Sequence, residues 1–329
     1  MPVRVDPLGV SGPTPGQARG PNWRRTSQGF YVPADVDGEN VDQRILEASV
    51  VVPPQGAITG WAALRWQRGR WFDGTTASGD KLPVPIMIST HDIRPQAGIK
   101  PCGEGTRPEN IIVVDGVRVT NPVWSTSFAM RYAETPRRAA LALEMAAYND
   151  LASVAELAAM LGEQSGWTGV PNARLGLKLA GENAWSPAEV FLKQVWELEG
   201  GFPRPLQNVP IFDLSGRHIG TPDLFDPAAG VMGEYDGPDH LRADQRVTDV
   251  RRAADFADHH LECVTMLAGD TTGHFLARLD AAYRRAGRRR TRRTWTIEPP
   301  DWWISTRTVE QRRALTPDQR DRLLRYRIA

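Results

Sequence analysis

Cysteine is scarce in this sequence. Cys102 and Cys263 are the only two in 329 residues, and they lie far apart along the chain. No Cys-x-x-Cys pair exists, which excludes a zinc ribbon or finger built on such pairs. Two distant cysteines also exclude a disulfide framework, and this fits the cytoplasmic location that we expect.

Long apolar runs are missing as well. No stretch of 18 apolar residues occurs, so we expect no transmembrane helix and no membrane partner. Residues 1–20 lack the apolar core of a secretory signal. They are rich in Pro and Gly instead, and we expect a mobile leader there.

The sequence has no excess of charge of either sign. Forty Lys and Arg nearly balance 39 Asp and Glu, which leaves a formal net charge of +1. Net charge therefore selects no class of partner, and only the distribution of charge is informative. With 41% hydrophobic and 24% charged residues, the composition is that of an ordinary globular protein long enough for two domains.

Residues 21–184 mix strand and helix patterns, and we expect them to form a separate N-terminal mixed α/β domain. Aromatic and β-branched residues around Ser27-Gln28-Gly29 predict a hairpin, and Asp115-Gly116 between β-branched runs predicts another. Apolar spacing predicts helices over 41–48 and 59–69, and Thr135-Pro136 predicts the start of a third helical region.

From Ser186 onward, the patterns predict the order helix-strand-strand-strand-helix-strand. The helix begins at Ser186 and ends at Gly200-Gly201, and Ser215-Gly216 forms the turn of the hairpin that follows. The expected elements are a helix over 186–201, a hairpin over 203–227, a strand over 230–237, a helix over 241–261 and a strand over 262–268.

The stretch GEYDGPDHL, residues 233–241, places acidic residues and a histidine in close succession. Side chains alternate along a strand, so Glu234 and Asp236 share a face with Met232, and a paired strand brings Asp223 to the same face beside Ile219. Three carboxylates there repel one another unless a cation binds them. Oxygen ligands suit Mg²⁺ or Mn²⁺ rather than zinc, so we predict a metal site at Asp223, Glu234 and Asp236.

Each of these residues also has a purely local interpretation. Glu189 lies three residues after Ser186, the spacing of a capping box. His240 caps the next helix in this interpretation, and Asp249 pairs with Arg246 or Arg252 on a helix surface. Asp223 would be a turn residue, and the strand acids would face solvent. The residue pattern leaves both interpretations open.

The run SPAE … NVPIFDLSGRHIGTPDLFDPAAGVMGEYDGPDH resembles the restriction-endonuclease-like, PD-(D/E)xK nuclease superfamily. Over about 186–270 it is similar to the branch near very-short-patch-repair endonucleases, in which E-x-D-G-x-x-H replaces E-x-K. The resemblance implies an α/β fold with a restriction-endonuclease-like αβββαβ core over 185–283, a divalent metal ion and phosphodiester hydrolysis.

The resemblance also implies a set of catalytic residues. They are the helix acid Glu189, the motif acid Asp223, the strand pair Glu234 and Asp236, and His240, with Asp249 as a later helix acid. Asp236 stands where the superfamily usually has a lysine, which stabilises the attacking hydroxide or the charge on the phosphate. His240, a second metal ion or the pair Arg251 and Arg252 would have to take over that task.

The first half resembles the abortive-infection AbiEi-type antitoxin proteins. The similar segments are GFYVPADVD, AITGWAALRW, DGVRVTNPVWSTSFAMRY and SVAELAAM. The resemblance implies a small DNA-binding winged helix fused to an α/β domain, and a cognate toxin protein as a partner. The expected wing covers residues 23–32.

We expect residues 284–329 to form a basic C-terminal tail. The tail begins with RRAGRRRTRR, seven arginines in ten residues, which either lies along phosphates or remains a solvated charge run. Trp302-Trp303 either stacks on bases or packs against the body. The expected nucleic-acid-binding residues are Arg251, Arg252, Arg284, Arg285, Arg288, Arg289 and Arg290.

Together these patterns predict a metal-dependent endodeoxyribonuclease that hydrolyses DNA phosphodiester bonds in repair or defence. Mg²⁺ or Mn²⁺ is the expected cofactor and DNA the expected partner, with RNA as the alternative substrate. The alternative function is a non-catalytic DNA-binding antitoxin or transcriptional regulator built on a decayed nuclease core.

Overall fold

The computed structural model describes residues 1–76, 78–94, 96–237 and 254–327. The protein has a mixed α/β fold with four sheets in the described part. It divides into two compact units, of which unit 1 comprises Met1–Ala142 and Ala155–Leu177, and unit 2 comprises Leu143–Val154 and Lys178–Ala329. This division differs from the single boundary expected at residue 184, because segment 143–154 packs with later residues, as the bond from Lys193 to Glu144 shows.

Unit 1 is built on a five-stranded mixed sheet in the order β6-β5-β4-β8-β7. Its strands are β4 (Ala57–Ile58), β5 (Val84–Met87), β6 (Ile99–Cys102), β7 (Ile111–Val114) and β8 (Val117–Thr120). The predicted turn joins β7 to β8, with φ of 47° at Asp115 and 78° at Gly116. Both central residues of such a tight hairpin turn need positive φ, which explains the Asp-Gly pair.

Helices cover this sheet and extend the unit. Apolar side chains of α1 (Val41–Ser49) and α2 (Gly60–Trp66) join those of β5 and β8 in one buried cluster. Asn40 caps α1, and Asn121 caps the unexpected helix α3 (Pro122–Arg131). The remaining elements of this region are η2 (Pro108–Asn110), α4 (Pro136–Tyr148), α5 (Val154–Glu163) and α6 (Val170–Leu179).

The first residues differ from the expected mobile leader. Strand β1 (Val3–Arg4) pairs with β3 (Phe30–Pro33), which also forms the predicted hairpin with β2 (Trp23–Ser27). The Asp6 carboxylate accepts backbone hydrogen bonds from Leu8, Val10 and Ser11, and η1 (Gln17–Arg19) follows. These residues are ordered by hydrogen bonds rather than by an apolar pattern, so composition did not reveal their structure.

Unit 2 contains a four-stranded sheet in the order β14-β13-β12-β9. Its strands are β9 (Leu206–Gln207), β12 (Leu224–Asp226), β13 (Val231–Asp236) and β14 (Glu262–Leu267). The first three are antiparallel neighbours, and β14 runs parallel to β13. A second sheet joins β10 (Ile211–Asp213) to β11 (His218–Gly220) and β15 (Trp295–Thr296). The predicted strand through 219–225 is therefore two strands in different sheets.

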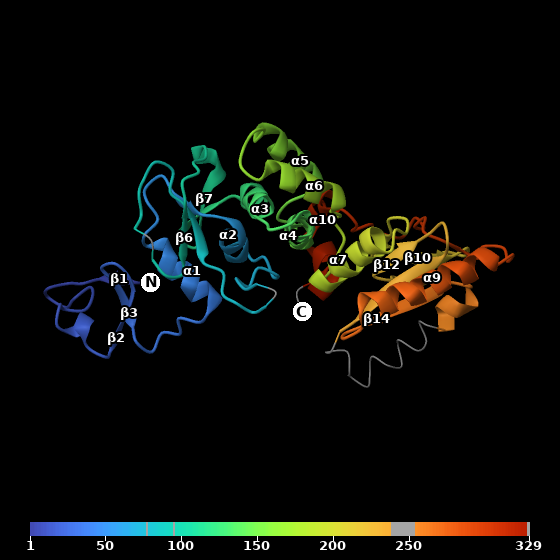
Figure 1. Cartoon of the computed structure of the whole chain (residues 1–329), viewed down its shortest axis with the longest axis horizontal. Helices are drawn as coiled ribbons and strands as arrows, with labels where there is room; N and C mark the ends of the chain where they lie inside the picture. The colour runs from blue at the N-terminus through green and yellow to red at the C-terminus, as the bar shows by residue number, and fades with distance from the viewer. Residues whose placement is uncertain (77, 95, 238–253, 328–329) are drawn as a thin grey trace. The chain divides into compact units, whose positions relative to one another are not determined.

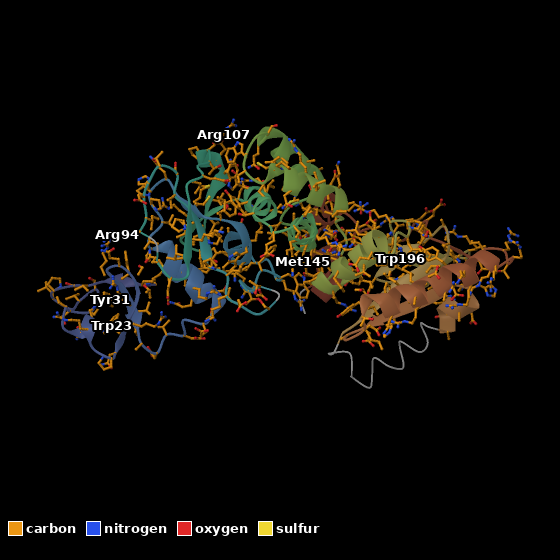
Figure 2. All side chains as sticks on the ribbon, viewed as in Figure 1. Trp23, Tyr31, Arg94, Arg107, Met145 and Trp196 are labelled. Carbon is orange, nitrogen blue, oxygen red and sulfur yellow. The ribbon has the colours of Figure 1, made fainter. Side chains whose placement is uncertain are left out.

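Two helices cover one face of the four-stranded sheet. Side chains of α7 (Pro187–Gln194), its continuation as one turn of π-helix (Val195–Glu199) and α9 (Thr272–Arg288) share one buried cluster with β12, β13 and β14. Figure 1 shows the ribbons of α7 and α9 beside the strands of this sheet. The fully buried Trp196 lies in this cluster (Figure 2), and a Cβ at Gly233 would come within 3.0 Å of its ring. Most of the predicted helix over 241–261 lies outside the described residues, although 254–258 is helical.

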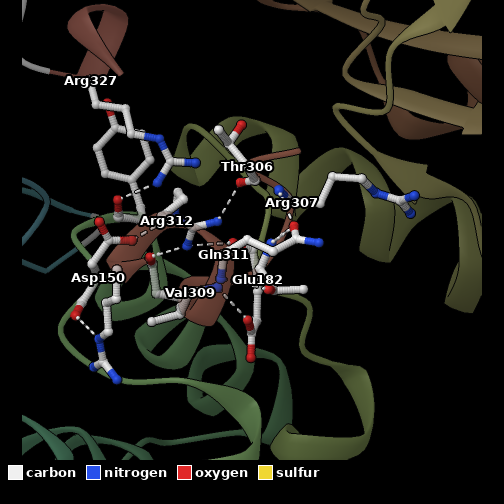
Figure 3. A network of polar contacts seen from close by, with 12 residues as sticks. Asp150, Glu182, Thr306, Arg307, Val309, Gln311, Arg312 and Arg327 are labelled. Carbon is white, nitrogen blue, oxygen red and sulfur yellow. Dashed lines mark hydrogen bonds and ion pairs between the residues drawn. The ribbon is translucent and has the colours of Figure 1, made fainter. Parts of the chain in front are cut away.

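Residues 284–327 contain more regular structure than the expected basic tail. Residues 284–288 are the last turn of α9, and β15 pairs with β10. The chain continues into α10 (Val309–Arg313), α11 (Pro317–Leu323) and a last turn, Arg325–Arg327. Arg312 of α10 is fully buried in a polar network (Figure 3). Within the described residues, no helix combines the length and apolarity that a membrane crossing requires.

Candidate functional site

The register of β12 and β13 places two of the predicted acids opposite each other. Leu224 pairs with Gly233 and Phe225 with Met232, so the preceding Asp223 faces the following Glu234 across the strands. Residues opposite each other in antiparallel strands project from the same face. That face also carries Phe225 and Met232, which pack with Ile219 in one buried cluster. The Oδ2 atom of Asp223 accepts a hydrogen bond of 2.8 Å from the backbone N–H of Tyr235.

Glu189 lies in the first turn of α7 and is 7% exposed. The N-cap Ser186 accepts a bond from the backbone N–H of Glu189 and donates its hydroxyl to Oε1 at 3.0 Å. The backbone N–H of Trp185 donates to Oε2 at 2.7 Å. The interpretation of Glu189 as a capping residue is therefore confirmed by its contacts with Ser186. Its carboxylate also accepts a bond from Trp185, the residue before the N-cap.

Glu189 is also electrostatically linked to Asp223. Burial, followed by repulsion from the Asp223 carboxylate, raises the pKa of Glu189 to about 8, although the hydrogen bonds from Trp185, Asn208 and Ser186 act in the opposite direction. A carboxyl with this pKa is mostly protonated at neutral pH. Ionising Glu189 in this buried place beside Asp223 is therefore unfavourable, despite its three hydrogen bonds.

Asp236 lies at the end of β13 and is exposed, whereas Glu234 is partly buried. Among the described residues, no three His, Cys, Asp or Glu side chains are grouped closely enough to hold a metal ion. Two residues of a strand span about 6.6 Å, which separates Asp236 from the Asp223–Glu234 level of the sheet. The predicted triad is thus a facing pair with a more distant third acid.

Several predicted site residues lie outside the described part of the chain. They are His240, Asp249, Arg251 and Arg252. The predictions that assign them to catalysis, to a helix cap or to phosphate binding stay predictions.

The predicted basic residues around the end of α9 differ in their surroundings. Arg285 and Arg289 both form ion pairs with Glu262, which is 8% exposed. Arg284 pairs with Asp280 on the same helix. Arg288 and Arg290 are exposed and form no ion pair within the described residues. Three of the five arginines at 284–290 thus form ion pairs within the protein, two of them with the buried Glu262.

Two asparagines near the acids were not predicted from the sequence. The Nδ2 of Asn208 donates to Glu189 Oε2 at 2.6 Å, and its backbone N–H donates to Asp223 O at 3.0 Å. Asn183 and Asn208 each donate an amide N–H to a backbone carbonyl of the other. Asn208 has a positive φ of 46°, a conformation that asparagine tolerates. Its hydrogen-bond partners lie far away in the sequence, so no local sequence pattern predicts its role.

Comparison with protein-family models, curated proteins and solved structures found no match for this chain. The case for a function therefore rests on the residues and geometry of the chain.

Proposed function

We propose that unit 2 is a divalent-metal-dependent nuclease that hydrolyses DNA phosphodiester bonds. The observation that carries this proposal is the meeting of Asp223 and Glu234 on one sheet face, next to the buried Glu189 whose pKa is raised to about 8. Buried acids with perturbed pKa values gather at functional sites more often than elsewhere.

The order of elements supports a restriction-endonuclease-like core as part of this proposal. Helix α7 precedes three antiparallel neighbours, β9, β12 and β13, and the fourth strand β14 then runs parallel to β13. The predicted order was helix-strand-strand-strand-helix-strand, but its first two strands were assigned to the hairpin at Ser215-Gly216, and β9 and β12 take that place in the sheet. Most of the predicted middle helix lies outside the described residues. The hairpin of β10 and β11 is an insertion between the first two strands of that core.

The acids present fit a magnesium or manganese ion without a third protein carboxylate. Mg²⁺ is commonly held by one or two carboxylates together with water and substrate phosphates. Asp223 and Glu234 would supply these ligands. The negative charge of Asp223, which contributes to the raised pKa of Glu189, is charge that a bound cation would neutralise. A bound ion would activate water and neutralise charge that develops on the phosphate.

The surrounding groups hold the acids in place and handle a proton. The N–H of Tyr235 fixes Asp223, and the N–H of Trp185 and the amide of Asn208 fix Glu189. Because Glu189 retains its proton near neutral pH, it can donate to an oxygen at the reacting phosphate. General acid help of this kind accelerates a reaction by roughly 10²–10⁴.

Cleavage assays with substitutions of the two facing acids test this proposal. The full-length protein is incubated with supercoiled plasmid, single-stranded DNA and RNA, in Mg²⁺, Mn²⁺ or EDTA. Asp223→Asn and Glu234→Gln should each lower metal-dependent cleavage about a hundredfold or more, the loss typical of a group that stabilises the transition state. Glu298→Gln changes an exposed acid of the same unit and should cleave like the wild type. Undiminished cleavage by Asp223→Asn would contradict the assignment.

The alternative is a DNA-binding antitoxin or regulator without catalysis. One observation favours it, namely that the described residues contain no group of three metal-ligating side chains. In that case the wild type should bind DNA in every buffer and cleave none of the three substrates. The same assay, read with a binding measurement, therefore separates the two functions.

A further inference from the structure

A pocket of about 390 Å³ lies beside the acids of unit 2. Three tryptophans, Trp185, Trp302 and Trp303, form part of its wall, together with Asn208 and the two arginines Arg307 and Arg322. Pockets that bind small molecules measure about 300–1,000 Å³. This pocket is thus at the small end of the range and is unusually rich in indole rings.

The pocket wall is bonded directly to the candidate catalytic acids. Trp185 and Asn208 both donate hydrogen bonds to Oε2 of Glu189, at 2.7 and 2.6 Å. The backbone N–H of Asn208 also bonds the carbonyl oxygen of Asp223. A ligand that contacts Trp185 or Asn208 in the pocket would therefore touch a residue that is hydrogen-bonded to Glu189, and in the case of Asn208 also to Asp223.

Two polar atoms in the wall lack partners. The Oδ1 atoms of Asn183 and Asn208 are buried and accept no hydrogen bond from any described residue. These side chains are 8% and 3% exposed, and their Nδ2 groups are already used. Buried polar atoms without partners are uncommon in folded proteins. The wall thus offers acceptors for a ligand that carries N–H donors.

The tryptophans differ in how firmly they are held. Trp303 packs against Phe212 and His218, with ring centroids 5.0 and 5.2 Å apart. Trp302 meets Trp303 edge-on at 5.6 Å and is 62% exposed. A large exposed indole on a firm aromatic support is a surface on which another planar ring can stack.

We propose that this pocket takes one unstacked nucleobase of a single-stranded nucleic acid and so places the neighbouring phosphate at the acids. Trp302 supplies the stacking surface, the asparagine oxygens supply an acceptor for a base N–H such as the N3–H of thymine or uracil, and Arg307 and Arg322 pair with phosphates. The proposal rests on the proposed function. A paired base cannot enter such a pocket without leaving its stack, so single strands are the preferred ligand.

The test measures binding without cleavage. Full-length protein in EDTA is titrated with an oligothymidine of about twelve nucleotides, within the site sizes of single-strand binders, and with an abasic oligomer of equal length and charge. The wild type should bind the oligothymidine more tightly. Trp302→Ala should weaken that binding about 5- to 150-fold, which corresponds to about 1–3 kcal/mol for one stacked base, and leave the abasic oligomer unaffected.

Two further variants complete the test. Trp302→Phe keeps a ring and should restore most of the affinity, whereas Leu214→Ala removes an apolar side chain that is 66% exposed elsewhere in unit 2 and should change nothing. Oligouridine, run in parallel, shows whether DNA or RNA is the better source of the base. Equal wild-type affinity for oligothymidine and abasic oligomer, or an equal loss on both in Trp302→Ala, would overturn the base pocket. The binding test in EDTA does not depend on cleavage. If the nuclease proposal alone were wrong, this test would still show base-dependent binding, while the cleavage assay would show no hydrolysis.

Discussion

At the scale of single residues, Glu189 combines a structural and a chemical role. Its contacts to Ser186 and Trp185 begin α7, and its burial, followed by its proximity to Asp223, raises its pKa. A capping glutamate needs neither burial nor a neighbouring acid. The spacing from Ser186 predicted the cap from sequence alone. The shifted pKa depends on burial and on a residue 34 positions later, and no local pattern contains that information.

The raised pKa of Glu189 predicts a pH dependence of stability. The folded protein holds this proton up to about pH 8, whereas the unfolded chain releases it near its ordinary value of 4.5. The folded state therefore binds more protons than the unfolded state between these values, and the free energy of unfolding falls as pH rises through this window. Glu189→Gln removes the titration. Its melting temperature relative to the wild type should rise from about pH 5 to about pH 8, measured in EDTA.

Glu298→Gln provides the control for that comparison, because Glu298 is exposed. Its melting temperature should follow the wild type at every pH. Parallel curves for Glu189→Gln and the wild type would show that Glu189 titrates at its ordinary value, and the charge coupling to Asp223 would be wrong.

At the scale of elements, the sequence correctly predicted turns and helix starts, because these depend on residues close together in the chain. The Asp115-Gly116 and Ser215-Gly216 turns both occur where predicted, with Gly216 at a φ of 87°. Helix α7 begins after Ser186, as its cap indicated. The break between β11 and β12 was not predictable, because it depends on which strands pair: β11 pairs with β10, whereas β12 pairs with β9 and β13 in the other sheet.

The ion pairs of the arginines around the end of α9 predict which of these residues contact phosphates. Arg285 and Arg289 are occupied by Glu262, whereas Arg288 and Arg290 are exposed. Each phosphate contact on duplex DNA adds about 0.9 to the slope of log affinity against log salt. The double variant Arg288→Gln/Arg290→Gln should therefore flatten that slope by up to about 1.8, measured by fluorescence anisotropy.

The matched control is Arg285→Gln/Arg289→Gln, which removes the same charge from the same turn. It should change the salt slope much less but lower the melting temperature, because Glu262 is left buried without its partners. Equal slopes in both double variants would mean that net charge, rather than the exposed pair, determines the affinity.

At the scale of the whole molecule, each unit has its own hydrophobic core, one around β5 and β8 in unit 1 and others around β12 and β13 in unit 2. The sequence predicted two domains but not that unit 2 includes residues 143–154 and the C-terminal helices. A basic segment such as residues 284–329 is typical of a solvated surface. Only tertiary partners can stabilise a buried charge in such a segment.

Arg312 is that buried charge, and it joins α10 to the segment at the end of α4. Its Nε donates to Asp150 Oδ1 at 2.6 Å, and Nη2 donates to Ala147 O at 2.7 Å (Figure 3). Glu182 reinforces the join by accepting the backbone N–H of Val309 at 2.7 Å. The C-terminal helices are therefore part of the fold of unit 2.

Arg312→Met should consequently destabilise unit 2 by about 3–5 kcal/mol, the cost of leaving a buried charge without its partner. Asp150, 9% exposed at its side chain, would lose this ion pair and keep the one with the half-buried Arg320. Urea unfolding measures the loss, and hydrogen exchange should show residues 143–154 and 304–327 losing protection together, before the five-stranded sheet of unit 1. Arg313→Met, on the same helix but exposed, should cost about 1 kcal/mol, because an exposed side chain contributes little more than an ordinary hydrogen bond such as the one it donates to the Asp150 carbonyl. If both variants unfolded like the wild type, the C-terminal segment would not contribute to the stability of unit 2, and the expectation of a separate basic tail would be correct.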